Sequence, residues 1–438
     1  MGPLAGVTVV ALEQAVSAPM CTRTLADFGA RVIKVENPAG GDFARHYDDV
    51  VLGQAAHFVW VNRGKESVAL DLKSEAGVAV LHRLLSRADV LVSNLAPGAV
   101  GRLGLSSAEL AEKYPELISV EIDGFGAGGP LSHKRAYDLL VQAESGVCAV
   151  TGTADAPAKP GPPMADVTTG LYAALSILAA LYERDRVRAA PSGGAGGLAA
   201  SGSVAGSDDT GRGIAGSGRG GGPRPGASIA VSLFDTMAEM MGYHLTYARH
   251  SGIDQLPLGM SSPAVAPYGA YPTRDGRTVV LGTTNDREWQ RLATAILDRP
   301  DLAADDRFRT NPGRTRHRAE LDEAIADWCA RHDLADIQRI ADAAGIGNSQ
   351  YNRPSEVLNH PQLVERDRWR EITTPAGPIP SLLPPAILSG FDPPMNPVPG
   401  LGEHTDAVLT ELGYAAPEIA TLRSSSVIGG ATPAEAIP

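Results

Sequence analysis

The first 122 residues alternate between short β-branched runs and helical patterns, and this alternation constrains the fold more than any other feature of the sequence. The runs predict strands, and the patterns between them predict helices. In chain order we expect a strand at 6–12, a helix at 21–28, strands at 31–35 and 68–72, a helix at 75–85, a strand at 89–93, a helix at 106–114 and a strand at 117–122. Units of this kind build parallel sheets with helices on both faces. The sequence therefore predicts an α/β fold with a doubly wound sheet.

The loop after the first predicted strand reads EQAVSAPMC and lacks the GxGxxG pattern that grips a pyrophosphate in dinucleotide-binding folds. A nicotinamide or flavin cofactor is therefore not indicated. A doubly wound sheet still presents a ligand crevice at the carboxyl ends of its strands, although the fold alone does not name the ligand.

The chain of 438 residues is longer than one hydrophobic core usually supports, so we expect two domains. After a further strand at 228–233 and a methionine-rich helix, a smaller domain is predicted. Its elements are strands at 268–272 and 278–281, joined by an Asp-Gly turn, and helices at 287–297, 316–332 and 334–344. Gly, Ser and Ala dominate residues 188–226, which predicts a flexible insert; a phosphate-cradling loop is the alternative, but GKS and GKT are absent.

The net charge of −12 and the pI near 5.3 argue against nonspecific binding to nucleic acid or to an anionic membrane. The longest apolar run, 167–182, is shorter than the roughly 20 residues of a spanning helix, so no membrane segment is expected. The three cysteines lie far apart without CxxC spacing, which indicates neither a disulfide framework nor a zinc site. A cytoplasmic location is expected.

The stretch PPMADVTTGLYAALSILAALYERD at 162–185 places one aspartate at the start of an apolar helix. Aspartate is among the most common N-cap residues, so this stretch alone favours a cap at Asp166. The alternative is a nucleophilic carboxylate. Deciding between them requires the rest of the chain.

The stretch HKRAYDLL at 133–140 also allows two interpretations. It is either a solvated basic turn leading into a helix that ends at Glu144, or a positive patch for an anionic ligand. Motifs of the HExxH, paired CxxC and GxSxG kinds are absent, so metalloprotease, zinc-ribbon and serine-hydrolase functions have no support.

Ordered motifs along nearly the whole chain, apart from the glycine-rich insert, resemble those of the class III CoA-transferases. This family includes formyl-CoA transferase, carnitine CoA-transferases and the α-methylacyl-CoA racemases. The motifs are LADFGARVIKVENP at 25–38, NRGKESVALDLKS at 62–74, SNLAPGAVGRLGL at 93–105, GFGAGGP at 124–130, RAYDLLVQAESG at 135–146, PMADVTTGLYAAL at 163–175, TNDREWQRL at 284–292, NHPQL at 359–363 and LGEHTDAVLTELGY at 401–414.

The resemblance implies a fold and a set of site residues. It implies a Rossmann-like large domain built from both ends of the chain, a smaller α+β domain and a homodimer with interlocked subunits. The implied boundaries are 1–187, the insert at 188–226, a connecting helix and small domain at 227–355, and a C-terminal segment at 356–438 that returns to the large domain. Asp166 corresponds to the covalent nucleophile and Tyr137 to a tyrosine beside the reaction centre. The implied CoA contacts are Val16, Leu70, Lys73, Asn94, Leu95, Arg102 and Arg135.

Two departures narrow the expected activity. Racemases of the family carry a histidine in a GHD motif where this chain has Ala136, Tyr137 and Asp138, so Asp166 would lack its proton-exchange partner. The glycine-rich loop of formyl-CoA transferase has no clear match, and the nearest stretch is PLGMSSPAVAPYG from Pro257. We therefore expect transfer of CoA from an acyl-CoA to a free acid. The alternatives are a 2-methylacyl-CoA racemase and a noncatalytic acyl-CoA-binding protein.

The expected mechanism needs CoA and acyl-CoA as substrates and no permanently bound cofactor or metal. Because a helix N-terminus favours negative charge, Asp166 is expected to be ionised near neutral pH. Tyr137 and the amides of 124–129 are candidates to stabilise oxyanions. The acceptor is expected to be a dicarboxylate if the polar residues Ser261, Ser262, Asn348, Gln350 and Asn352 lie near it, although turn positions are the favoured interpretation of those residues.

Overall fold

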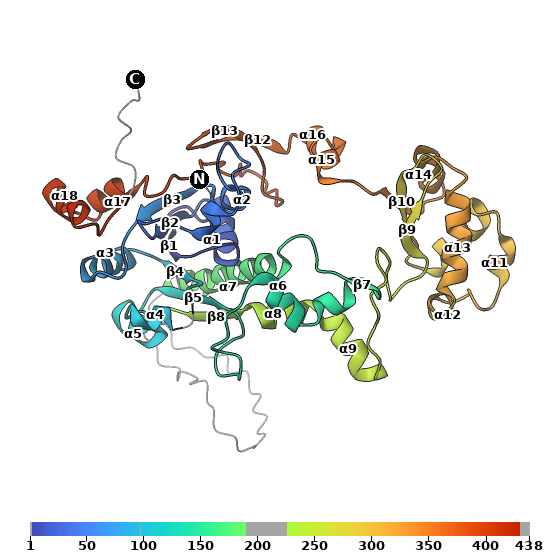
Figure 1. Cartoon of the computed structure of the whole chain (residues 1–438), viewed down its shortest axis with the longest axis horizontal. Helices are drawn as coiled ribbons and strands as arrows, with labels where there is room; N and C mark the ends of the chain where they lie inside the picture. The colour runs from blue at the N-terminus through green and yellow to red at the C-terminus, as the bar shows by residue number, and fades with distance from the viewer. Residues whose placement is uncertain (1, 97, 190–225, 430–438) are drawn as a thin grey trace, which may run out of the picture.

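The computed structural model describes residues 2–96, 98–189 and 226–429 and shows a mixed α/β protein (Figure 1). Its central sheet has six parallel strands in the spatial order β3-β2-β1-β4-β5-β8. The strands are β1 Thr8–Leu12, β2 Arg31–Glu36, β3 Lys65–Ala69, β4 Val90–Ser93, β5 Ile118–Asp123 and β8 Ser228–Ser232. The expectation of an α/β fold with a parallel sheet is confirmed.

Alternating side chains of β1 enter two hydrophobic clusters, one on each face of the sheet. Val9 and Ala11 face one cluster, and Val10 and Leu12 face the other. A strand covered on both faces needs apolar residues at every position, which is why GVTVVAL reads as a continuous run. The helices that contribute to the first cluster are α1 Ser17–Asp27, α6 Asp138–Glu144, α7 Met164–Ala189 and α8 Leu233–Met240. Those that contribute to the second are α3 Glu75–Leu85, α4 Ala99–Arg102, α5 Ser107–Lys113, α17 Thr405–Glu411 and α18 Ala416–Ser424.

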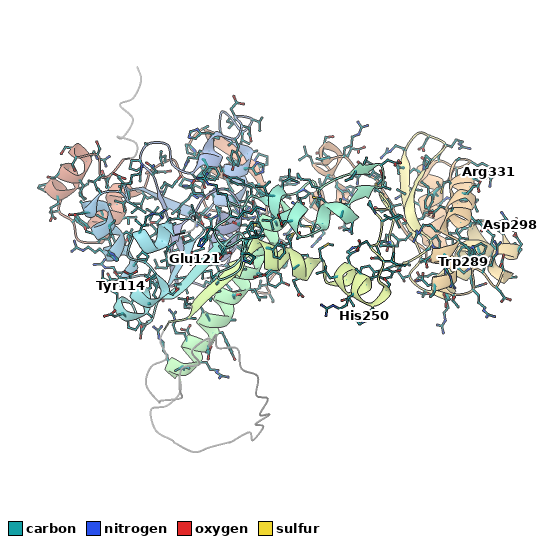
Figure 2. The ribbon with its side chains drawn as sticks, turned by 60° about the horizontal axis from the view of Figure 1, so that its bottom comes forward. Tyr114, Glu121, His250, Trp289, Asp298 and Arg331 are labelled. Atoms are coloured by element: carbon teal, nitrogen blue, oxygen red, sulfur yellow. The ribbon has the colours of Figure 1, made fainter. Side chains whose placement is uncertain are left out.

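A second, antiparallel sheet forms the other lobe of the molecule (Figure 1). Its strands are β9 Tyr268–Pro272, β10 Thr278–Gly282 and β11 Gly347–Gln350. Its helical segments are α10 Asp286–Arg291, the π-helical turn Leu292–Ile296, α11 Pro300–Ala304, α12 Asn311–Arg316, α13 Arg318–Cys329 and α14 Leu334–Ala343. Trp289 is fully buried among them (Figure 2), and the lobe has its own hydrophobic cluster.

The C-terminal segment returns to the edge of the parallel sheet, where α17 lies beside β3 and α18 packs on α17 (Figure 1). The Thr405 hydroxyl accepts a hydrogen bond from the Ala69 amide at 3.1 Å, and Leu70 forms a bridge with Ile428. Arg31 pairs with Glu411 across 380 residues of sequence. The domain boundaries stay a prediction, and the predicted insert, apart from residues 188, 189 and 226, lies outside the described residues.

The remaining elements connect these parts. They are the 3-10 turns η1 Phe43–His46 and η2 Val147–Val150, helices α2 Ala56–Asn62, α9 Gly242–Ser251, α15 Pro354–Val357 and α16 Pro361–Val364, the small pair β6 Gly152–Thr153 and β7 Ala156–Pro157, and the hairpin β12 Trp369–Thr374 with β13 Gly377–Leu382. The sequence analysis did not predict η1, α2 or this hairpin. It also placed the third strand at 68–72, whereas β3 begins at Lys65 because the Lys65 ammonium and the Ser67 hydroxyl have buried polar partners.

The apolar helix α7 has 26 residues and is longer than the run counted in the sequence. By length and composition alone, its residues Met164–Arg188 are sufficient to cross a membrane, and it is the one such helix in the described part of the chain. The buried side of α7 packs on α1, α6, α8 and the sheet. Its other side exposes Leu175 and Tyr182, which are 62% and 70% accessible.

Candidate active site

A cavity of about 630 Å³ lies at the carboxyl ends of β1, β4 and β5. The chain passes from β1 to its neighbours β2 and β4 in opposite directions, which leaves a crevice at this edge of a parallel sheet. Six of the predicted site residues line the cavity: Val16, Asn94, Leu95, Arg135, Tyr137 and Asp166. They come from the loops after β1 and β4, from the segment that leads into α6 and from the first turn of α7. Residues far apart in the sequence thus meet at one place.

The loop after β1 is held in an unusual backbone conformation. Ala15 has φ of 62°, a left-handed value that residues with a Cβ rarely adopt. Its amide donates to Asp42 Oδ1 at 3.0 Å. On the other side, Asn94 accepts from the Gln14 amide at 2.9 Å and donates to the Gln14 carbonyl at 2.8 Å. These contacts direct Val16 and Ser17 into the cavity, and they give Asn94 a structural role that is independent of any ligand.

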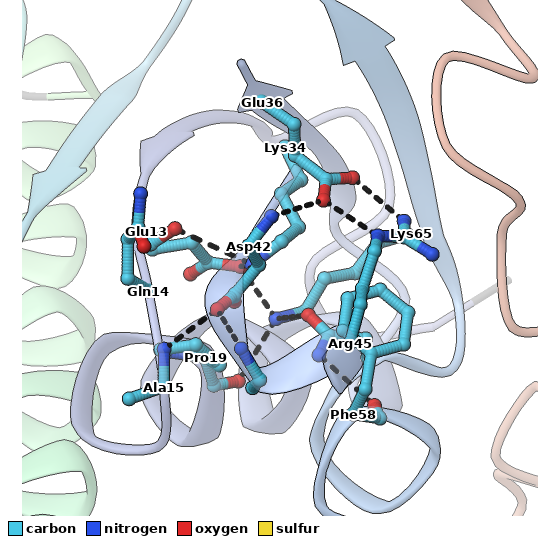
Figure 3. Close-up of polar contacts among 12 residues, drawn as sticks. Glu13, Gln14, Ala15, Pro19, Lys34, Glu36, Asp42, Arg45, Phe58 and Lys65 are labelled. Carbon is cyan, nitrogen blue, oxygen red and sulfur yellow. Dashed lines mark hydrogen bonds and ion pairs between the residues drawn. The ribbon is translucent and has the colours of Figure 1, made fainter. Parts of the chain in front are cut away.

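A buried ionic cluster supports this loop from behind (Figure 3). Lys34 Nζ lies 2.8 Å from Asp42 Oδ2 and 3.3 Å from Glu13 Oε1, and Lys65 Nζ donates to Glu13 Oε1 at 2.7 Å. All four side chains have 0% exposure, so each charge depends on its partners. Burial lowers the pKa of Lys65 to about 8 against the attraction of Glu13.

Asp42 joins two walls of the cavity. Besides the Ala15 amide, its Oδ1 accepts from the Ala44 amide at 2.9 Å and so caps η1. The turn η1 carries Phe43, and Tyr47 follows it; both side chains line the cavity. The position of Asp42 therefore sets the distance between the first loop and the aromatic wall.

Asp166 is the third residue of α7 and not its N-cap, which corrects the local sequence interpretation. The first intrahelical bond runs from the Val167 amide to the Pro163 carbonyl at 2.9 Å. The cap is supplied by another segment: Asp138 Oδ1 accepts from the Ala165 and Asp166 amides at 2.9 and 3.4 Å. The carboxyl group of Asp166 is therefore not used for capping, and it lines the cavity.

The pKa of Asp166 is raised to about 7, mainly by burial and then by repulsion from Asp138, whereas the Ser17 hydroxyl lowers it. Burial therefore opposes the ionisation that the helix N-terminus favours, and the expectation that Asp166 is ionised near neutral pH stays a prediction.

Tyr137 is 59% exposed and precedes the first residue of α6. Of the glycine-rich segment 124–129, only Gly124 lines the cavity. The Gly126 amide already donates to Asp123 Oδ1 at 2.6 Å. Within this segment only the Gly124 amide is therefore placed to contact an oxyanion in the cavity, whereas the sequence analysis considered all the amides of 124–129.

The sequence analysis missed the aromatic wall. Phe43, Tyr47 and His57 line the cavity, and the rings of Tyr47 and His57 meet edge to face with centroids 5.7 Å apart. The pKa of Tyr47 is raised, first by burial and then by the charges of Asp42, Asp166 and Tyr137. The clustered aromatic residues of 43–60 were the available signal.

Three predicted CoA contacts do not line this cavity. Leu70 is 1% exposed, so its side chain is part of the core. The Lys73 amide donates to Asp71 at 3.0 Å, and Arg102 lies on α4. The side chains of Lys73, Arg102 and Arg135 form no hydrogen bond or ion pair with any described residue, which leaves these cations available to a ligand.

The polar residues considered for the acceptor acid do not line the cavity either. Ser261 donates to the Tyr268 carbonyl at 2.7 Å, and Asn348 donates to Asp342 at 2.7 Å. Gln350 donates to Asn352 at 2.6 Å. These local bonds favour the interpretation as turn residues. Within residues 2–96, 98–189 and 226–429, no group of three or more His, Cys, Asp or Glu side chains is placed to hold a metal ion.

Comparison with known proteins agrees with this arrangement. The sequence profile of CoA-transferase family III matches residues 4–196 and 218–405. The chain belongs to CoA-transferase family III. The acetyl-CoA:oxalate CoA-transferase of Acetobacter aceti is 32% identical over 95% of this chain and 97% of its own length. The succinate–glutarate CoA-transferase of Agrobacterium fabrum is 31% identical, with coverage of 94% and 96%.

Solved structures of the family share the fold. A CAIB/BAIF family protein from Brucella suis superimposes with a TM-score of 0.74 and 30% identity, covering 94% of this chain and 99% of its own. The resemblance inferred from the ordered motifs is thus confirmed, and the protein is a CoA-transferase.

Proposed function

We propose that this CoA-transferase moves CoA from an acyl-CoA thioester to a free carboxylic acid through a covalent intermediate on Asp166. One observation carries the proposal: the Asp166 carboxyl group does not cap α7, and it lines the cavity together with Tyr137, Asn94 and Arg135. Family membership supports the reaction type, and this placement supports Asp166 as the proposed nucleophile.

The proposed steps use only substrate and carboxylate chemistry. An Asp166 oxygen attacks the acyl carbonyl, the C–S bond breaks and CoA leaves as thiolate, giving a mixed anhydride. The bound thiolate then attacks the aspartyl carbonyl and releases the first acid as carboxylate, giving an aspartyl-CoA thioester. The incoming acid attacks this thioester and expels the thiolate, which attacks the acyl carbonyl of the second anhydride. CoA leaves on the new acid, and Asp166 is regenerated.

Charge on the developing oxyanions is proposed to be stabilised by the Tyr137 hydroxyl and by the Gly124 amide, since both residues line the cavity beside Asp166. The CoA phosphates are proposed to meet Arg135 at the cavity and Lys73 and Arg102 beyond it, because these cations have no partner among the described residues. Val16, Asn94 and Leu95 are proposed to contact the pantetheine arm near the thiol, and Leu70 to contribute through its backbone.

The acceptor is proposed to be a dicarboxylate. Relatives that match most of this chain are named for oxalate, glutarate and D-citramalate. In this chain Lys134 lines the cavity and pairs with Glu144 at 2.8 Å; it is proposed to pair with the second carboxylate of the acid, whereas Arg135 contacts the CoA phosphates. Screening carboxylic acids against acetyl-CoA and succinyl-CoA, with products measured by mass, identifies the acid.

The nucleophile is tested by replacing Asp166 with alanine or asparagine and measuring exchange between acyl-CoA and free acids. We expect a loss of at least about 10³-fold in kcat, as for removal of a covalent nucleophile. Turnover near the wild-type rate would contradict the proposal. Deuterium incorporation at the α-carbon of a 2-methylacyl-CoA would instead indicate a racemase, and CoA binding without exchange across a broad acid panel would indicate a binding protein.

A cytoplasmic homodimer with a Rossmann-like large domain is proposed as the working form. Support for a second subunit comes from the unpaired apolar side of α7, where Leu171, Leu175 and Tyr182 are 46%, 62% and 70% exposed. An exposed apolar surface of this kind usually marks an interface. A second copy of the chain is the proposed occupant; α8, which packs on α7, and the following helix α9 also expose apolar side chains, Met240 and Tyr243.

A further inference from the structure

A second cavity, of about 870 Å³, lies between α2 and the β12–β13 hairpin. None of the described residues lines both this cavity and the one at Asp166. Much of its wall is apolar and accessible: Val50, Leu52 and Trp60 are 74%, 57% and 39% exposed. Contact between apolar side chains and water is unfavourable, so a ligand that covers these side chains gains binding free energy.

The charges of this cavity are all of one sign. Arg23, Arg63, Arg366 and Arg368 line it, and the described lining contains no aspartate or glutamate. This concentration of arginine occurs in a chain whose net charge is −12. A cationic cavity in an acidic protein indicates a site for an anion.

Only some of the guanidinium groups in this cavity are paired with acceptors of the protein. Arg63 and Arg368 donate to Asp27 and to carbonyl groups of residues 382–384. Arg23 has one contact, an ion pair with Asp27 at 3.1 Å. Arg366 forms no hydrogen bond or ion pair within the described part of the chain. Guanidinium donors of Arg23 and Arg366 therefore remain free in the lining of the cavity.

The deeper end of the cavity has an excess of buried positive charge. The side chains of Arg23 and Arg63 are 12% and 3% exposed and share the single carboxylate of Asp27. Burial lowers the pKa of Arg23 to about 10 against the attraction of Asp27, and Arg63 adds repulsion, so Arg23 is charged at neutral pH. Trp369 Nε1 is buried without an acceptor among the described residues, and Arg23 Nε, although 3.1 Å from Asp27 Oδ2, does not donate to it in hydrogen-bonding geometry. A buried donor such as Trp369 Nε1 needs a partner.

We propose that this second cavity binds a small carboxylic acid with an apolar body. Its carboxylate lies between Arg23 and Arg366, where planar guanidinium groups match carboxylate oxygens. Its hydrocarbon part covers Leu52 and Trp60. A phosphate would use the arginines but leave the apolar wall exposed, so a carboxylate with a chain or ring fits better.

The second cavity shares helix α2 with the Asp166 cavity. Helix α2 presents His57 to the Asp166 cavity and Trp60 to the second cavity, and the two rings are 6.3 Å apart. An acid bound at Trp60 therefore contacts the helix that forms a wall of the Asp166 cavity. Binding itself does not depend on the covalent mechanism.

The experiment is a calorimetric titration of the full-length protein with butanoate, hexanoate and octanoate, and with octanamide as the neutral match. We expect affinity to rise by up to about fourfold per methylene group, as burial of hydrocarbon predicts. Octanamide should bind more weakly. Arg366→Gln should weaken octanoate binding by about tenfold or more, because a charged hydrogen bond is lost. Arg287→Gln, at an exposed arginine without a described partner in the other lobe, should have no effect.

Two controls separate this site from the Asp166 cavity and from a subunit contact. Octanoate should bind to Asp166→Asn with wild-type affinity, and saturating CoA should not displace it. The proposal is wrong if octanoate does not bind at millimolar concentration, if Arg366→Gln binds normally, or if CoA competes. It is also wrong if Arg366→Glu and Leu52→Asp convert a dimer to monomers, since a second copy would then fill the cavity.

Discussion

Replacing Asp138 by asparagine tests how the charge on Asp166 is controlled. The asparagine keeps the oxygen that accepts from the Ala165 amide at 2.9 Å and so preserves the cap of α7. Its amide group would face Gln142, whose Nε2 now donates to Asp138 at 2.7 Å. Gln142 Oε1 is buried and has no partner among the described residues, so a turn of the Gln142 amide accommodates the new donor. The substitution removes one charge and few contacts.

The expected size of the effect follows from Coulomb's law. Asp138 Oδ1 lies 3.4 Å from the Asp166 amide nitrogen, which places the two carboxyl groups in close range. Two unit charges about 6 Å apart repel by about 3 kcal/mol at an effective dielectric constant of about 20, or about two pKa units. This value is an upper limit, because burial is the larger cause of the raised pKa of Asp166. We expect the pKa to fall from about 7 to between about 5 and 6.

The assay is the pH dependence of kcat/KM for CoA exchange. Attack requires the ionised carboxylate, so activity rises with pH through the pKa of Asp166 in the free enzyme. In Asp138→Asn this rise should occur at lower pH, and activity near pH 6 should exceed that of the wild type. Glu239→Gln is the matched control, since it removes one exposed charge from α8, outside the cavity, and its carboxylate has no partner among the described residues. An unchanged profile in Asp138→Asn, or an equal shift in Glu239→Gln, would refute the reasoning.

Three further predictions address stability, positioning and assembly. Because burial raises the pKa of Asp166 from 3.8 to about 7, this carboxyl group lowers the free energy of unfolding progressively as pH rises from about 4 to about 7. Asp166→Asn should therefore increase the free energy of unfolding at pH 8 by about 1–3 kcal/mol and have little effect near pH 4, measured by urea denaturation. Asp42→Asn removes the main charged partner of Lys34, so we expect a loss of about 3 kcal/mol of stability and a fall in kcat/KM of the folded fraction. The control is Arg45→Gln, which weakens the ion pair with Glu36 and leaves the hydrogen bond between Asp42 and the Ala15 amide in place. It should lower stability without changing kcat/KM. Leu175→Asp should shift the proposed dimer to monomers in light scattering, and an unchanged mass would remove α7 from the interface.

Regular periodicity made most of the fold predictable. Helix α3 at Glu75–Leu85 was predicted with its observed bounds, because Ser74 caps it and its apolar residues recur at helical spacing. The start of β3 was missed because Lys65 is polar in sequence and becomes acceptable in a strand only through Glu13, which lies 52 residues earlier. The run AHFVWVN of α2 carries no side-chain cap, so the sequence offered no helix signal there.

The candidate site was only partly predictable for a similar reason. Ordered motifs located Asp166, Tyr137 and Asn94, which the fold brings to one cavity. The cap of α7 comes from Asp138, which lies 27 residues earlier in α6. A local sequence pattern cannot predict a capping residue that belongs to another helix. The raised pKa of Asp166 likewise depends on burial and on that same distant carboxylate. Contacts between residues far apart in the sequence therefore determine both the cap of α7 and the raised pKa of Asp166, and the sequence alone did not predict either.

The central claim is that Asp166 carries the acyl group and then CoA during transfer. The direct measurement is incubation of the protein with acyl-CoA alone, trapping with hydroxylamine or borohydride, and mass analysis of the peptides. We predict an adduct on Asp166 that forms at least as fast as turnover and is absent in Asp166→Asn. Full transfer activity with no adduct on Asp166, or with an adduct on another residue, would contradict the account.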